Sequence, residues 1–144
     1  LQRIGFVQQC PRCQFRRESA GLVPAQGCCP ECGEPLTPIG PLYLGGIQDP
    51  GTLQEMQERI SGRDLMTAKD LHAILALCRE ELPTSSFYDY HRIAKAERVS
   101  PPDIVTVLAR IRAEGYRATR THFSGYGIRT DAPLPVIIRA VSAR

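Results

Sequence analysis

Residues 10–33 read CPRCQFRRESAGLVPAQGCCPECG and hold five of the six cysteines of the chain. Two CxxC pairs with 15 residues between them have the spacing of a four-thiolate zinc site, formed by Cys10, Cys13, Cys29 and Cys32. A CxxC turn brings two sulfurs onto one ion and points backbone N–H groups at them. Gly33 can adopt the positive φ needed where the chain leaves the second turn. Because all four ligands are thiolates and no coordination position is open, we expect the zinc to be structural.

Other uses of these cysteines fit the sequence less well. A disulfide framework suits a secreted protein, but the chain starts without a signal segment and the two pairs are too regular. A redox CxxC needs one pair on a strand-to-helix turn, whereas this chain has two matching pairs. Cys28 could replace Cys29 as a ligand, but the CPxC pattern that both pairs share favours Cys29.

Short strands are expected around the CxxC pairs, because apolar residues occur at 4–7 and a further strand-like segment at 14–17. This order of strands and CxxC turns predicts a zinc ribbon over residues 1–35. A unit of this size buries too little apolar surface to fold without the ion. Residues 36–51 are rich in proline and glycine but also apolar, which predicts an ordered connector with a short strand at 42–44.

The composition is that of a globular protein. The chain has 144 residues and a mass of 16.0 kDa, with 42% hydrophobic and 23% charged residues. No run approaches the roughly 18 apolar residues of a membrane span, so we expect no membrane partner. Cysteines suited to a metal, together with the missing signal segment, predict a cytoplasmic protein. The chain begins with Leu1 rather than methionine, from which we expect a fragment of a longer protein.

The positive charge is concentrated in the last third of the chain. Residues 101–144 carry seven arginines against three acidic residues, whereas residues 1–50 carry four of each and residues 51–100 carry seven basic against eight acidic residues. This distribution predicts one basic face and a polyanionic partner. A solvated, arginine-rich surface without a partner is the alternative.

Two capping boxes predict where the first helices begin. Thr52 with Glu55, and Thr67 with Asp70, each place a hydroxyl residue three positions before an acidic one. The second box is followed by an apolar stripe at helical spacing, formed by Leu71, Ile74, Leu75, Cys78 and Leu82. Since Cys78 belongs to this stripe, we expect it to be a buried core thiol rather than a ligand or a nucleophile.

Two further helices and a hairpin are predicted after residue 86. The first helix lies within residues 87–99, and the second is capped by Ser100 and ended by Gly115. The inward positions of these helices are expected to be Tyr90, Ile93, Ala94, Ile104, Val107, Leu108 and Ile111. Two strands joined by a glycine turn follow over residues 116–130, and a final helix is expected at 135–142. Helix–turn–helix followed by a hairpin is the winged-helix order, so the predicted fold class is α+β, a zinc ribbon followed by a winged-helix-like domain.

Arginine and aromatic residues alternate on the second helix and the hairpin, at Arg110, Arg112, Tyr116, Arg117, Arg120, Phe123, Tyr126 and Arg129. This mixture suits phosphate contact combined with base stacking, as in RNA binding. It also suits a wing that grips duplex DNA, or a domain used only for packing on a neighbour. We expect no catalytic residue, because neither His91 nor His122 has a Ser or Cys nucleophile or a set of carboxylates beside it in the sequence.

Several short segments occur at characteristic mutual spacing, namely GPLYLG at 40–45, FY at 87–88, SPP at 100–102, GYRATRTHF at 115–123 and TDA at 130–132. Together they resemble the C-terminal domain of the tRNA (guanine-N2)-dimethyltransferases that modify guanine 26. The resemblance covers the chain from Ile4 to about Val136. It implies the architecture of that family, which has an N-terminal catalytic domain that binds S-adenosylmethionine and a C-terminal domain that engages tRNA and carries a zinc knuckle.

The resemblance implies zinc at the same four cysteines and tRNA as the partner of a domain over residues 52–144. It makes Arg117, Arg120, Thr121 and His122 candidates for contact with the tRNA backbone or for packing on the N-terminal methyltransferase domain. This chain has no glycine-rich cofactor loop and no Asn-Pro-Pro-Tyr-type segment. The resemblance therefore places S-adenosylmethionine and methyl transfer in a catalytic domain that this chain lacks, and the chain alone is not expected to be active.

Two other functions are compatible with the same residues. A DNA-binding regulator would place the helix of residues 101–114 in a major groove, although that helix carries no Asn or Gln to read bases. A purely structural module would dock on its own catalytic domain and bind no nucleic acid, and an apolar patch around residues 42–47 would mark it.

Overall fold

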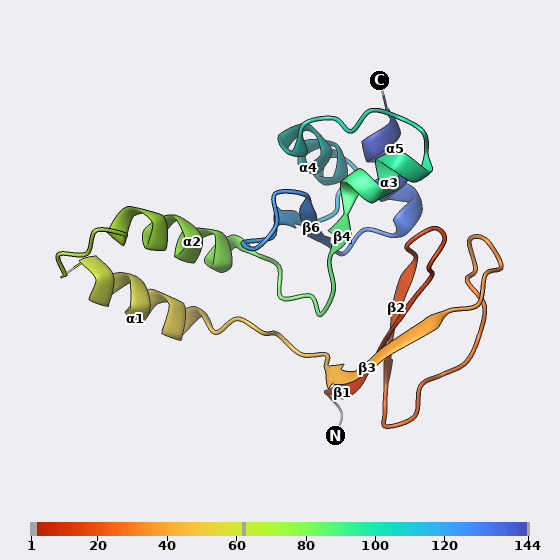
Figure 1. The fold of residues 1–144 in the computed structure, drawn as a ribbon, viewed down its shortest axis with the longest axis horizontal. Helices are drawn as coiled ribbons and strands as arrows, with labels where there is room; N and C mark the ends of the chain where they lie inside the picture. The colour runs from red at the N-terminus through yellow and green to blue at the C-terminus, as the bar shows by residue number, and fades with distance from the viewer. Residues whose placement is uncertain (1–2, 62, 144) are drawn as a thin grey trace.

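The structure is a computed structural model that describes residues 3–61 and 63–143. Helices and two small antiparallel sheets make up the described part (Figure 1). In chain order the elements are β1 (Ile4–Gln9), β2 (Arg16–Ala20), β3 (Thr37–Tyr43), α1 (Pro50–Ser61), α2 (Ala68–Glu80), β4 (Tyr88–Asp89), α3 (Tyr90–Ala96), α4 (Ile104–Ala113), β5 (Ala118–Arg120), β6 (Gly127–Thr130) and α5 (Leu134–Ser142). This mixture of helices and antiparallel strands confirms the predicted combination of α and β structure at the level of class.

The N-terminal sheet has the strand order β2-β1-β3. β1 lies in the centre and pairs antiparallel with both neighbours, so that both of its edges are hydrogen-bonded. Phe6 and Val7 of β1 are buried, and Gln8 is fully enclosed, with its amide bonded to Ala25 and Arg17. The short strand predicted at 42–44 is the end of β3, which begins five residues earlier because pairing with β1 outweighs the local effect of its prolines and glycines.

The α1–α2 hairpin projects to one side of the molecule, and the C-terminal end of α2 lies beside the second sheet (Figure 1). α1 contains no buried residue, and α2 buries only Leu75. The prediction of a continuous buried stripe along α2 is therefore wrong: Ile74 is 46% exposed and Cys78 is half-buried rather than a core thiol. The physical reason is that α2 packs mainly on α1 and has no further layer to cover its apolar positions.

The helix starts also differ from the capping boxes of the sequence. α1 begins at Pro50, and the Oδ1 of Asp49 accepts a hydrogen bond from the N–H of Thr52 at 2.7 Å, so Asp49 and not Thr52 caps this helix. Thr67 precedes α2 as predicted, but its side chain makes no capping hydrogen bond.

The N–H of Thr52 lowers the pKa of the Asp49 carboxyl. A lowered pKa in the folded state means that the cap stabilises α1 at neutral pH and is lost when acid protonates the carboxylate.

Substitutions at Asp49 and at Thr52 show which of the two residues caps α1. We expect Asp49→Ala to speed amide hydrogen exchange in the first turn of α1 severalfold, since the first N–H groups of the helix lose their acceptor. Thr52→Ala serves as the matched control and should leave the exchange rates almost unchanged. A larger effect from Thr52→Ala than from Asp49→Ala would restore the capping box that the sequence predicts.

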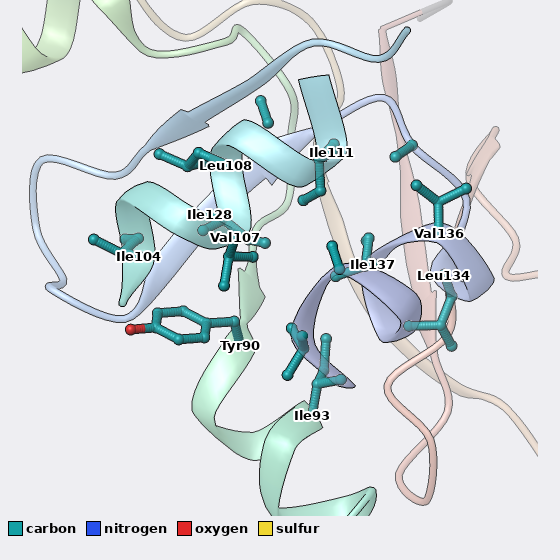
Figure 2. Packing of buried hydrophobic residues seen from close by; sticks show 14 of the residues in the cluster. Tyr90, Ile93, Ile104, Val107, Leu108, Ile111, Ile128, Leu134, Val136 and Ile137 are labelled. Carbon is teal, nitrogen blue, oxygen red and sulfur yellow. The ribbon is translucent and has the colours of Figure 1, made fainter. Parts of the chain in front are cut away.

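The main hydrophobic core lies between α3, α4, α5 and the second sheet, and Figure 2 shows the side chains of these elements converging. All the inward positions predicted for the two helices are buried here: Tyr90, Ile93, Ala94, Ile104, Val107, Leu108 and Ile111. Ser100 does not cap α4. Instead Asp103 does, because its carboxylate accepts from the N–H of Val105 at 2.8 Å. Gly115 follows the end of α4 with a φ of 89°, as predicted.

The second sheet has the order β4-β6-β5, with β6 in the centre. The predicted hairpin is present as β5 and β6, in which Thr119 faces Arg129. The predicted last helix is α5, which covers the core from the C-terminal side. β4 has only two residues and carries no sequence signal of its own. Within residues 3–61 and 63–143, every helix is too short or too polar to cross a lipid bilayer.

Candidate metal site and nucleic-acid interface

Two backbone turns of matching geometry carry the CxxC pairs. In the first, the N–H of Gln14 donates to the carbonyl of Cys10, and in the second the N–H of Gly33 donates to the carbonyl of Cys29. Gln14 and Gly33 also share a positive φ, at 66° and 75°. Sequence reasoning identified this conformation for Gly33 but missed it for Gln14, because glutamine carries no signal for it. The two turns thus present their sulfurs in the same way.

The four cysteine sulfurs form one cluster, in which all Sγ atoms lie within 4.8 Å of one another. The Sγ–Sγ distances are 3.4 Å for Cys10–Cys32, 3.4 Å for Cys13–Cys29 and 3.7 Å for Cys13–Cys32. Zinc–sulfur bonds of about 2.3 Å separate the sulfurs of a tetrahedron by roughly 3.8 Å. The donor set and its spacing therefore fit a tetrahedral zinc ion. Cys28 is exposed and lies outside the cluster, on the bridge that it forms with Pro35.

Within the cluster, the Cys10 thiol ionises more readily than a free cysteine, whereas burial raises the pKa of the Cys13 thiol. Burial alone would raise the pKa of the Cys10 thiol, but hydrogen bonds from the backbone N–H groups of Cys13 and Arg12 outweigh it and lower the pKa to about 7. One of these N–H groups, that of Cys13, lies 3.4 Å from the Cys10 sulfur. A thiolate is consequently accessible near neutral pH at a position where zinc requires one.

The first CxxC turn also connects the N-terminal sheet to the main core. Cys13 and Phe15 pack against the core cluster of the C-terminal helices. The guanidinium of Arg16 lies over the rings of Phe87 and Tyr88, at 5.5 and 5.1 Å from their centroids. The turn that carries two of the metal-site cysteines thus contributes to the position of the helical part.

Three arginines of the last third are neutralised by acidic partners. Arg117 pairs with Asp131 at 2.8 Å on the surface, and Arg139 pairs with Glu114. Arg129 is only 3% exposed and pairs with the buried carboxylate of Glu81 at 2.6 Å. The sequence made Arg129 a candidate for RNA contact, but its burial prevents contact with a ligand that is bound at the protein surface.

The buried carboxylate of Glu81 is the centre of a polar cluster that the sequence did not indicate, and the side chain of His122 in this cluster is 34% exposed. Its second oxygen lies 2.6 Å from the Nδ1 of His122, and the Nη1 of Arg129 is 3.5 Å from the hydroxyl of Thr84. Thr121 is also buried, and its hydroxyl donates to the carbonyl of Ser124. Of the candidates named from the sequence, Thr121, His122 and Arg129 therefore hold the hairpin in place. No local pattern could have revealed Glu81, since its partners lie 41 and 48 residues away.

Arg110, Arg112 and Arg120 have no acidic partner within the described residues. Arg110 donates to the carbonyls of Ala140 and Ala143 at the end of α5. Arg112 donates to the carbonyl of Ala118 at 3.0 and 2.6 Å, while Arg120 is exposed. Arg110 and Arg112 are two residues apart on α4 and point to different sides, Arg110 toward α5 and Arg112 toward β5. The single basic face expected from the charge distribution stays a prediction.

Aromatic side chains accompany these arginines. Phe123 and Tyr126 lie in the turn between β5 and β6, and they are 52% and 54% exposed. Tyr126 packs on His91 with ring centroids 4.1 Å apart, and Phe123 packs edge-on against Phe87 at 5.0 Å. Each ring is therefore held in position while part of its surface remains open to solvent. Tyr116, by contrast, is half-buried against the core.

Comparison with known proteins matches the whole of this architecture to one family. The family model for N2,N2-dimethylguanosine tRNA methyltransferase matches residues 1–142. The chain belongs to this family. The resemblance stated from the short sequence segments is thereby confirmed.

Similar proteins of this family are considerably longer than the chain. The tRNA (guanine(26)-N(2))-dimethyltransferase of Methanoregula boonei is 50% identical over 144 residues, and that of Methanoculleus marisnigri is 51% identical over 142 residues. The matches cover 100% and 99% of this chain but only 38% of each relative. Trm1 from Pyrococcus horikoshii, solved in complex with S-adenosyl-L-methionine, superposes with a TM-score of 0.81 and 26% identity. That match covers 97% of this chain and 35% of the solved chain.

Proposed function

We propose that this chain is the tRNA-positioning part of an S-adenosylmethionine-dependent tRNA (guanine-N2)-dimethyltransferase. Membership of the family supports this assignment, and so does the fraction of each relative that the chain covers. In this proposal the methyl donor and the reacting amine are bound by the methyltransferase domain of the same protein, since the residues described here offer no glycine-rich turn for the cofactor. The proposed partners are thus tRNA and that domain, and a cytoplasmic location remains a prediction.

The metal part of the proposal assigns zinc to Cys10, Cys13, Cys29 and Cys32. Sulfur spacing and the paired turns support it. Zinc would replace the hydrophobic core that the small β1–β3 sheet lacks, and it would take no part in methyl transfer. The proposed ribbon of residues 1–35 is extended by the pairing of β3 with β1.

The helical part is proposed to be a winged helix within residues 52–144. The element order α2, β4, α3, α4, β5, β6 and the sheet order β4-β6-β5 support this name. In this description α4 takes the place of the recognition helix and the β5–β6 hairpin takes the place of the wing. Because β3 pairs with β1, only residues 44–49 of the expected 36–51 connector would then link the sheet to α1.

One observation carries the proposed tRNA contact: α4 and the β5–β6 hairpin carry both the arginines without an acidic partner and the exposed rings. Arg112 and Arg120 have no acidic partner in the described part of the chain, and Phe123 and Tyr126 expose half of their surface. Guanidinium groups bind phosphates, and aromatic faces stack on unpaired bases, so this surface suits folded RNA with single-stranded loops. The DNA-binding alternative finds no support in the comparisons.

Arginine substitutions in the full-length protein test this contact. We expect Arg120→Ala to weaken tRNA binding and to reduce the slope of log K against log salt by about 0.7–0.9, because one phosphate contact is lost. Arg117→Ala should have a smaller effect, since Asp131 already neutralises that guanidinium. Both values come from fluorescence anisotropy titrations at several salt concentrations.

The control for charge alone is Arg63→Ala. Arg63 is exposed and lies between α1 and α2. This variant should bind tRNA with almost the wild-type slope. Equal losses in Arg63→Ala and Arg120→Ala would show that only net charge matters. Unchanged binding in Arg120→Ala would remove this surface from the interface and favour a module that only packs on its own catalytic domain.

A further inference from the structure

A cavity of about 220 Å³ opens between the end of α2, the flank of α4 and strand β5. Its apolar wall is formed by Leu77, Val105 and Leu108, and its polar wall by Glu80, Arg112 and Arg120. Leu108 lies on the flank of α4 that faces away from α5 (Figure 2). The cavity thus borders the surface proposed to bind tRNA, and it combines an apolar wall with two cationic groups.

The walls of this cavity are held by specific hydrogen bonds. The N–H of Leu82 donates to the hydroxyl of Thr119 at 3.0 Å, which ties the segment after α2 to β5. The guanidinium of Arg112 is fixed on the carbonyl of Ala118. The buried cluster around Glu81 also anchors the same end of α2 to the hairpin. The shape is therefore set by the fold and does not depend on free side chains alone.

We propose that this cavity holds one unpaired nucleotide of the bound RNA. The inference rests on the proposed function and names a subsite of that surface. The base would lie against Leu77, Val105 and Leu108, and its phosphate would contact the exposed guanidinium of Arg120. A base that is paired in a duplex presents only its edges, whereas an unstacked base can enter a hollow and use its faces.

The size of the cavity fits a single base. Clefts that enclose drug-sized ligands have volumes of roughly 300–1,000 Å³, so a cavity of about 220 Å³ is too small for several stacked nucleotides. Val105 is 57% exposed on the apolar wall, which gives a base a hydrophobic contact that is accessible from solvent. The phosphate and sugar would remain at the mouth, where Arg120 is accessible.

Glu80 adds a preference among the bases. A carboxylate accepts hydrogen bonds but donates none when ionised, so it pairs with an exocyclic amino group. Adenine, cytosine and guanine carry such a group, whereas uracil offers only its N3–H, which lies between two carbonyl oxygens that repel a carboxylate. The cavity is therefore expected to prefer a base with an amino group over uracil.

Methyl NMR of the full-length protein with labelled leucine and valine methyl groups tests the subsite. Three probes are added in turn: single-stranded oligoadenylate, oligouridylate of equal length, and a blunt RNA duplex. We expect oligoadenylate to shift the methyl signals of Leu77 and Val105, with at least severalfold weaker binding of oligouridylate. The duplex should bind the basic face and leave these methyl signals in place.

Two variants separate the parts of the inference. Glu80→Ala should reduce the preference for oligoadenylate over oligouridylate, whereas Glu58→Ala on α1 is the matched control and should keep it. Equal affinity of wild-type protein for both oligomers would overturn the role of Glu80. If RNA binds but the two methyl signals do not move with oligoadenylate, the subsite is wrong and the proposed function stands. If neither tRNA nor any of the three probes binds, the proposed function itself fails.

Discussion

Cys29→Ser is expected to abolish the folded structure of the β1–β3 sheet, while Cys28→Ser leaves it intact. In the proposal, three remaining thiolates hold zinc too weakly to compensate for the small core of this sheet. Zinc contributes about 10–16 kcal/mol to the folding of zinc-finger peptides, far more than Phe6 and Val7 can supply by burial. Hydrogen exchange read residue by residue should show loss of protection throughout β1, β2 and β3.

The two neighbouring cysteines make this comparison well controlled. Both substitutions remove one sulfur, but only the sulfur of Cys29 belongs to the four-sulfur cluster. Metal analysis should find one zinc per wild-type chain and per Cys28→Ser chain, and much less in Cys29→Ser. Equal zinc content and equal protection in the two variants would contradict the assignment. Chelation of the wild-type protein should reproduce the effect of Cys29→Ser.

Arg129→Met is expected to lower the free energy of unfolding by about 3–5 kcal/mol, as removal of one partner does in other buried ion pairs. The side chains of Glu81 and Arg129 are 0% and 4% exposed, so water cannot replace the lost cation. The carboxylate of Glu81 would keep only His122 and would remain buried without full compensation. Chemical denaturation followed by circular dichroism measures the loss.

A double substitution distinguishes lost packing from uncompensated charge. Glu81→Leu combined with Arg129→Met removes both charges and should recover much of the stability that the single change loses. Arg117→Ala breaks an ion pair at the surface and should have a far smaller effect. The loss of unfolding free energy in the double variant should be smaller than the sum of the losses in the two single variants. A loss equal to that sum would contradict an electrostatic origin.

The features that sequence reasoning predicted correctly depend on neighbours along the chain. The inward positions of α4, Ile104, Val107, Leu108 and Ile111, follow from helical spacing alone, and all are buried. Gly115 ends that helix because a left-handed conformation favours glycine. The CxxC pairs predicted which sulfurs meet, since each turn fixes its two sulfurs locally.

The features that sequence reasoning missed depend on contacts between residues that are far apart in the sequence. β3 lies in a stretch rich in proline and glycine, and it is a strand because the free edge of β1 pairs with it. Cys78 has the spacing of a core residue, but α2 has too few neighbours to cover it. Arg129 has the charge of an RNA contact, yet Glu81 holds it in the interior. In each case the presence or absence of a partner that is distant in sequence decides the outcome.

These contacts indicate how the chain would present a rigid surface in the proposed function. The first CxxC turn packs on the main core through Cys13 and Phe15, so the proposed zinc ion would support the orientation of the helical part. The buried Glu81 cluster then fixes the hairpin that carries Phe123 and Tyr126. A rigid surface would bind one fixed shape of RNA, which is what positioning a single guanosine requires.

The most direct test of the tRNA-positioning role is a fluorescence titration of the 144-residue chain with tRNA and with duplex DNA of similar length at the same salt concentration. We expect clearly tighter binding of tRNA, since the arginines and exposed rings of α4 and the hairpin suit folded RNA with unpaired bases. Equal affinity for the two nucleic acids, or binding of neither, would contradict the proposal that this chain positions tRNA.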